Sequence, residues 1–105
     1  MNYKIRKRSS IEIILDILKS CEESCNITKV IYEAGINYAV AQKYVNELIK
    51  VNVLIVEGEG NKKLYKLTEK GKVLKEHLEE FLELRNKLEL EREKLKELFA
   101  RSMIL

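Results

Sequence analysis

Residues 28–50 read TKVIYEAGINYAVAQKYVNELIK and contain two helical patterns joined by a tight turn. We expect Thr28 to cap the first helix, and Gly35 to end it by adopting the left-handed conformation. Asn37 is the expected cap of the second helix, which covers 38–50. Two helices joined through such a turn predict a helix-turn-helix, in which the second helix is presented to a partner.

The second helix has one apolar and one polar face. The apolar stripe consists of Ala41, Val45, Leu48 and Ile49, which predicts a buried side. The opposite face is short-chained, polar or basic, and it carries no acid until Glu47 at its margin: Ala39, Gln42, Lys43, Asn46 and Lys50. In a DNA major groove, Gln and Asn side chains suit adenine, and lysine reaches guanine or phosphate. Tyr38 at the helix start is placed to donate its hydroxyl to a phosphate.

Two β-rich runs follow, at residues 53–57 and 63–67, on either side of the Gly-Glu-Gly-Asn-Lys segment 58–62. They predict a hairpin whose tip and return strand are basic through Lys62 and Lys63. A helix-turn-helix followed by a hairpin is a winged helix. The expected fold class is therefore mostly α with a small β-hairpin (α+β).

A further helix is expected at residues 9–20. Ser9 and Glu12 have the spacing of a capping box, and an apolar stripe follows at helical spacing: Ile11, Ile14, Leu15 and Leu18. The residues before it include four cations and no acid, namely Lys4, Arg6, Lys7 and Arg8. Such a block is typical of an arm that meets an anion, with a solubilising tail as the alternative.

Thr68 is the expected cap of a last helix that runs to about Ala100. At 1.5 Å per residue it spans roughly 45–50 Å, more than a small head can cover. Its leucines recur near heptad spacing, and each one left in water forgoes ~1.5–3 kcal/mol. We therefore predict a winged-helix domain at 1–70 and a coiled-coil dimerisation helix at 71–105, the alternative being a helix that folds back on its own head.

The predicted dimer is antiparallel, with its two-fold axis near Leu88. Phe81 then meets Leu95 of the second copy, and Arg85 meets Glu91, whereas a parallel pair would place Glu91 against itself. The expected interface lies along one stripe: Leu78, Phe81, Leu84, Arg85, Leu88, Glu91, Leu95 and Leu98.

Several segments resemble the small archaeal winged-helix proteins that are chromatin-associated or regulator-like and dimerise through a C-terminal antiparallel coiled coil. They are IEIILDIL (11–18), TKVIYEAGINY (28–38), YVNEL (44–48) and YKLTEKG (65–71). The resemblance implies double-stranded DNA binding by a homodimer, with a recognition helix that carries Tyr38, Gln42, Lys43 and Asn46. Ala39 and Ala41 depart from that pattern because they offer only methyl groups. Glu57 and Glu59 oppose phosphate binding by the wing.

No enzyme, cofactor or metal site is expected. The sequence contains no nucleophile–base set and no phosphate-binding glycine loop. Cys21 and Cys25 are expected to be buried thiols; the alternatives are a disulfide, which heat-adapted archaea tolerate inside the cell, and a metal site. Zinc needs about four ligands, and the single histidine, His77, lies on a different helix.

Composition agrees with this class of protein. The chain has 105 residues, 46% hydrophobic and 35% charged, with a formal net charge of +3. Disorder is therefore not expected, and no apolar run approaches the ~18 residues of a membrane span. We expect a cytoplasmic, nucleoid-associated transcription regulator or chromatin architectural protein. The rival is a winged-helix scaffold that binds proteins and not DNA; RNA is disfavoured because an aromatic stacking platform is missing.

Overall fold

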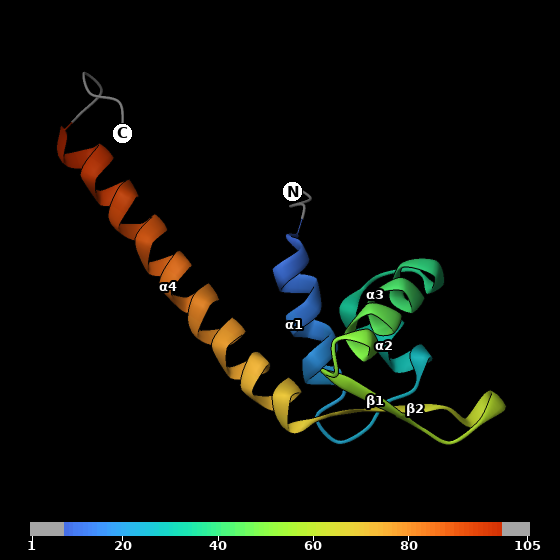
Figure 1. Cartoon of the computed structure of the whole chain (residues 1–105). Coiled ribbons are helices and arrows are strands. Elements are labelled where there is room, and N and C mark those ends of the chain that lie inside the picture. Colours follow the sequence, from blue (N-terminus) through green and yellow to red (C-terminus); the bar gives the residue numbers. More distant parts are fainter. Residues whose placement is uncertain (1–7, 100–105) are drawn as a thin grey trace.

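The computed structural model describes residues 8–99, and three helices, a hairpin and a long fourth helix follow one another along the chain (Figure 1). The elements are α1 (Ser10–Ser20), α2 (Ile27–Ala34), α3 (Tyr38–Lys50), β1 (Leu54–Glu57), the 3-10 turn η1 (Gly60–Lys62), β2 (Leu64–Leu67) and α4 (Glu69–Phe99). The first six form a head, and α4 leaves it as a rod. The predicted winged helix is confirmed. No helix within residues 8–99 has the length and apolarity needed to cross a bilayer.

The starts of α1 and α2 are fixed by side-chain caps. At α1 the predicted capping box is confirmed: the Glu12 amide donates to Ser9 Oγ at 3.3 Å, and the Ser9 amide donates to Glu12 Oε1 at 2.9 Å. At α2 the predicted cap, Thr28, is wrong. Asn26 caps instead, because its Oδ1 accepts from the Lys29 amide at 2.8 Å and its backbone is extended. An asparagine two residues earlier satisfies the helix start and leaves Thr28 inside the first turn.

The turn between α2 and α3 is as predicted. Gly35 has φ 66°, a left-handed conformation that a side chain would strain, and its amide donates to the Ile31 carbonyl. Asn37 Oδ1 then accepts from the Val40 amide at 2.8 Å and starts α3. The direction of α3 relative to α2 is therefore set by hydrogen bonds within the turn itself.

The core lies where α1 meets α2, α3, the hairpin and the start of α4. Ile17 was not in the predicted stripe of α1, yet it is completely buried. The reason is that α1 packs against α2 on one side and against α4 on another, so more than one face is covered. The other buried core members come from the three helices of the head, the two strands and the segments that join them: Leu18, Cys21, Cys25, Val30, Ala34, Ala41, Val45, Leu48, Val53, Leu54, Tyr65 and Leu67.

The hairpin is confirmed, although each strand begins one residue later than predicted. Leu54 pairs with Leu67 and both are buried, whereas the next pair, Ile55 and Lys66, faces the other side of the sheet. The tip contains the 3-10 turn, which the sequence did not predict. The segment around Cys25 joins β2 through an isolated bridge. The Cys25 amide donates to the Tyr65 carbonyl at 2.9 Å, and the Tyr65 amide donates to the Cys25 carbonyl at 2.7 Å.

Cys21 and Cys25 form a disulfide, so the expectation of buried free thiols is wrong, although both residues are buried. The chain turns back after α1 to reach the bridge with Tyr65, and this brings the two Cα atoms to 5.0 Å. That separation is within the span of a disulfide. The bond ties the end of α1 to the segment that pairs with β2.

The start of α4 is held tightly against the head. Thr68 caps it as predicted, because Oγ1 accepts from the Gly71 amide at 2.9 Å while it donates to the Asn52 carbonyl at 2.6 Å. A Cβ on Gly71 would lie 2.3 Å from the Val53 carbonyl oxygen and 3.1 Å from Leu67 Cδ2. Glycine is therefore required for this approach.

Ion pairs hold the next turns of α4 against α1. Lys75 Nζ lies 2.8 Å from Glu22 Oε2, and this hydrogen bond raises the pKa of Lys75 above its ordinary value of 10.5, with Glu79 adding to the effect. Farther along, Arg85 Nη2 contacts Glu12 Oε2 at 2.8 Å. These contacts fix the proximal part of α4 on the head and leave the part beyond Arg85 projecting (Figure 1).

Gly71→Ala tests the close approach at the start of α4. Within an ordinary helix this change stabilises by about 1 kcal/mol. Here we expect a loss of about 1–3 kcal/mol in the free energy of unfolding, because backbone must move to admit the methyl group. Urea unfolding followed by circular dichroism measures it, with Lys72→Ala on the exposed side of the same turn as control. A stabilised Gly71→Ala protein would contradict this packing.

Candidate nucleic-acid interface

The polar face of α3 is displayed to solvent because the opposite face is anchored in the core. Ala41, Val45 and Leu48 are buried, and Tyr38 is 60% exposed at the first turn. Lys43, Asn46 and Lys50 are also exposed. Gln42 is half-buried, and its Nε2 donates to Asn46 Oδ1 at 3.4 Å. This long, exposed hydrogen bond is weak, so either amide can be redirected to a ligand.

The tip of the wing carries two cations, of which Lys63 lines a groove together with Tyr38 and Gln42 of α3. Lys62 ends the 3-10 turn, where its amide donates to the Glu59 carbonyl at 2.9 Å, and Lys63 follows directly. Both lysines are exposed, as are Glu57 and Glu59. The wing therefore carries two lysines just before its return strand and two glutamates at and just after the end of its outgoing strand.

A groove of about 330 Å³ lies where α2, α3 and the wing meet. It brings together three residues predicted as DNA contacts, namely Tyr38, Gln42 and Lys63. The other lining residues were not predicted: Asn26, Ile27, Thr28, Gly60, Asn61 and Tyr65. No linear pattern indicates them, because they come from three separate elements. Lys63 is the only charged residue among those lining the groove.

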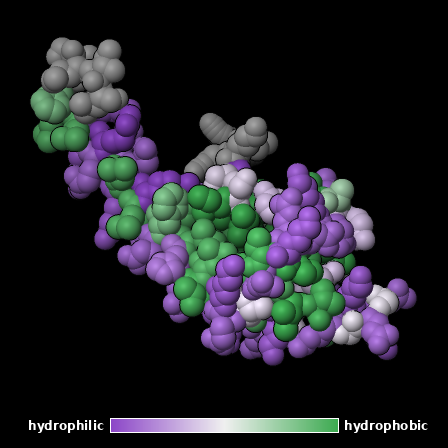
Figure 2. Space-filling model, viewed as in Figure 1, coloured by the Kyte–Doolittle hydropathy of each residue, from purple (hydrophilic) through white to green (hydrophobic). Residues whose placement is uncertain are grey.

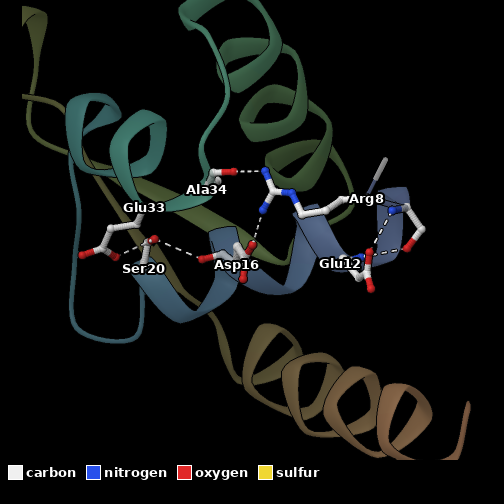
Figure 3. Close-up of polar contacts among 7 residues, drawn as sticks. Arg8, Glu12, Asp16, Ser20, Glu33 and Ala34 are labelled. Carbon is white, nitrogen blue, oxygen red and sulfur yellow. Dashed lines mark hydrogen bonds and ion pairs between the residues drawn. The ribbon is translucent and has the colours of Figure 1, made fainter. Parts of the chain in front are cut away.

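Arg8 occupies a different place from the one predicted. As part of a basic arm it was expected to reach an anion, but its Nη1 lies 2.6 Å from Asp16 Oδ2 and its Nη2 donates to the Ala34 carbonyl (Figure 3). Arg8 thus braces α1 against the end of α2. The other predicted arm residues, Lys4, Arg6 and Lys7, lie outside the described residues.

Ser20 extends this polar contact between α1 and α2. It is 1% exposed, and its hydroxyl lies 3.0 Å from the Asp16 carbonyl oxygen and 2.9 Å from Glu33 Oε1 (Figure 3). Because these bonds link one side of α1 to the C-terminal end of α2, at Glu33 and Ala34, they help to fix the orientation of the helix-turn-helix on the first helix. The contacts support the interface without belonging to it.

The predicted dimer residues divide into two groups. Leu78 packs against the core of its own head, and Arg85 is held by Glu12. Exposed apolar side chains then continue along α4, with hydrophobic patches visible between charged ones in Figure 2. They are Phe81 at 47%, Leu84 at 54%, Leu88 at 63%, Leu95 at 43% and Leu98 at 81% exposed. Glu91 is exposed and lies 3.6 Å from Lys94.

A family model described as "Winged helix-turn-helix" matches residues 7–86. The chain belongs to the winged helix-turn-helix family. The crystal structure of Sso10a-2, a DNA-binding protein from Sulfolobus solfataricus, is 50% identical, has a TM-score of 0.85, and is covered over 99% of its length by 90% of this chain. This similarity confirms the resemblance to small archaeal winged-helix proteins. No curated protein is significantly similar in sequence.

Two bacterial structures share the fold of this winged-helix chain at greater distance. A MarR/EmrR family transcriptional regulator from Acinetobacter sp. ADP1 is 25% identical with a TM-score of 0.62, over 86% of this chain and 67% of that one. BpsR from Bordetella bronchiseptica, whose DNA binding is regulated by 6-hydroxynicotinic acid, is 22% identical with a TM-score of 0.64. The match covers 77% of this chain and 64% of BpsR. At that identity BpsR shows the fold alone.

Arg8→Ala tests the brace between α1 and α2. We expect the free energy of unfolding to fall by about 1 kcal/mol, since the variant loses an ion pair and a hydrogen bond to a helix-end carbonyl at a partly exposed site. Arg8→Lys should recover only part of the loss, because lysine lacks the planar fork that reaches two partners. Lys19→Ala, on the exposed side of α1, is the control in urea unfolding. An Arg8→Ala protein as stable as the wild type would contradict the brace.

Proposed function

We propose that this winged-helix protein binds double-stranded DNA as a homodimer and acts as a transcription regulator or chromatin architectural protein on the cytoplasmic nucleoid. The observation that carries the proposal is the polar face of α3, which carries amides and lysines and shares a groove with Lys63 of the wing. Its similarity to Sso10a-2, described as a DNA-binding protein, supports the same conclusion.

In the proposed complex, α3 enters the major groove. Gln42 and Asn46 face base edges, where an amide can both donate to and accept from adenine. Lys43 and Lys50 lie on the same exposed face and neutralise phosphates, which releases condensed counterions from the duplex. The wing lysines, Lys62 and Lys63, contact phosphates of the neighbouring stretch of DNA backbone.

The balance of these contacts favours modest sequence specificity. Phosphate contacts fix position, whereas base contacts specify sequence. Ala39 offers only a methyl group to a base, and Glu57 and Glu59 place negative charge on the wing. Such a protein suits coating or organising DNA at many sites.

Lys43→Ala tests the role of α3. We expect affinity for duplex DNA to fall several-fold and nearly uniformly across sequences, and the slope of log K against log salt to become less negative by about 0.9, since one phosphate contact is lost. Fluorescence anisotropy at several salt concentrations measures both quantities. Lys19→Ala, on α1, should leave the slope unchanged. A wild-type protein that ignores duplex DNA even at low salt would favour the protein-binding scaffold.

The proposed dimer forms through α4. Beyond Arg85 the helix presents a row of leucines that no described part of the chain covers, and each would gain about 1.5–3 kcal/mol on burial. A second copy carries the same row. With the axis near Leu88, Phe81 meets Leu95 of the other copy, and Arg85 can share its carboxylate contacts between Glu12 and Glu91 of that copy. The antiparallel arrangement also avoids placing Glu91 against itself.

Single cysteine variants distinguish the possible arrangements of α4, since the native cysteines are already bonded to each other. In the antiparallel dimer Leu88→Cys lies beside its own copy and should cross-link under mild oxidation. Leu95→Cys should not cross-link to itself, but should do so when mixed with Phe81→Cys. Non-reducing gels and light scattering provide the readout. Cross-linking of both single variants would indicate a parallel pair, and a monomer by light scattering would overturn the dimer.

A further inference from the structure

The hydroxyl of Tyr65 is a polar group without a partner in an otherwise satisfied core. Tyr65 is 4% exposed and lies on β2, where its backbone is engaged with Cys25. Its side chain makes no hydrogen bond to any residue within 8–99. No side-chain polar atom in that range is both sealed and unpaired, so the hydroxyl keeps some contact with solvent, and Tyr65 is one of the residues that line the groove beside α3. Buried tyrosine hydroxyls ordinarily find a partner.

The walls of this groove suit an anion. The polar residues that line it are one lysine, two further hydroxyl residues and three amides, with no Asp or Glu among them: Lys63, Tyr38, Thr28, Asn26, Gln42 and Asn61. The groove between α1 and α4 has the opposite charge, because four glutamates and only one lysine, Lys19, line it: Glu76, Glu79, Glu80 and Glu83. Within the described head, negative ligands are therefore favoured on the α3 side and opposed on the α4 side.

We propose that the groove seats one phosphodiester of the bound duplex, with Tyr65 Oη donating from its floor and Lys63 Nζ from the wing. The inference rests on the proposed DNA binding and names one backbone contact within it. Because Tyr38 and Gln42 on α3 also line the groove, the strand seated there is held directly beside the recognition helix. The seat would then fix how deeply and at which register α3 enters the major groove.

The floor of the seat is rigid for a structural reason. Two backbone hydrogen bonds hold Tyr65 to Cys25, and the disulfide holds Cys25 to the end of α1. The hydroxyl is thus pre-positioned before DNA arrives, and little side-chain entropy is lost when it makes its bond.

Tyr65→Phe isolates this contact, because it removes one oxygen that has no partner in the free protein. We expect unchanged thermal unfolding and a roughly three- to tenfold loss of affinity for a short fluorescent duplex, which corresponds to one hydrogen bond. The salt slope should stay constant, since a neutral donor displaces no counterion. Lys63→Gln should also weaken binding, and should make the slope less negative by about 0.9.

Matched variants complete the test. Tyr32→Phe changes a tyrosine on α2 that is 85% exposed, and Lys66→Gln changes a lysine on the face of the hairpin opposite Tyr65; both should bind nearly as the wild type does. The double variant Tyr65→Phe/Lys63→Gln should lose less than the product of the single losses, because both donors act on one phosphodiester.

The outcomes separate this proposal from the one on which it rests. If the wild type binds DNA and Tyr65→Phe binds it equally tightly, the phosphodiester seat alone is overturned. The seat is also overturned if the effects of Tyr65→Phe and Lys63→Gln on affinity are fully independent. A wild type that fails to bind duplex at low salt would overturn the proposed function and the seat together.

Discussion

The approach of Gly71 to the Val53 carbonyl is the contact on which the geometry of the whole chain depends. It is possible only because residue 71 has no side chain, and Thr68 secures it by bonding the end of the α3–β1 connection and the first turn of α4 at once. The contact sets the direction in which a helix of 31 residues leaves the head. A small change of angle at this point would be magnified along the rod, so the position of any second head depends on this junction together with the ion pairs of Lys75 and Arg85.

The first helix serves both halves of the molecule. One side of α1 carries Asp16 and Ser20, which hold the helix-turn-helix through Arg8 and Glu33. Another side of α1 faces α4, and near the start of α1 the ion pair between Glu12 and Arg85 holds the two helices together. Because the same rigid element contacts the recognition unit and the rod, the two are mechanically joined through α1 as well as through the chain. Complete burial of Ile17 between these faces is the packing consequence.

Much of the fold was predictable because its signals are local. The Ser9–Glu12 box, the Gly35–Asn37 turn and the Thr68 cap each lie within a few residues, and the structure confirms all three. Prediction failed where a residue's fate depends on distant partners. The sequence places Arg8 in a basic arm, whereas in the structure its guanidinium donates a hydrogen bond to the carbonyl of Ala34, 26 residues away. The disulfide was missed for the same reason, since only the bridge to Tyr65 shows how the chain turns back after α1.

The candidate site illustrates the same division. The exposure of Tyr38 and Lys43 could be predicted from one helix face, because helical periodicity determines which side chains point away from the core. The place of Tyr65 in the groove could not be predicted, since its strand pattern predicts only a buried aromatic ring and the groove joins residues of separate elements.

The separation of basic and acidic residues on the head explains how a protein of small net charge can still bind a polyanion. The net charge of +3 is too small to act as a uniform field, and screening limits each exposed charge to a distance of about 8–10 Å. What matters is placement. The glutamates between α1 and α4 oppose phosphate on that side, whereas the groove beside α3 contains a lysine and no carboxylate. In the proposed complex a duplex would meet attraction on one side of the head and repulsion on the other, so its orientation would be selected before any base is contacted. In an antiparallel dimer the two-fold axis would repeat this polarity at the other end of the rod, which leaves the α4 layer for association between copies and the α3 sides for nucleic acid.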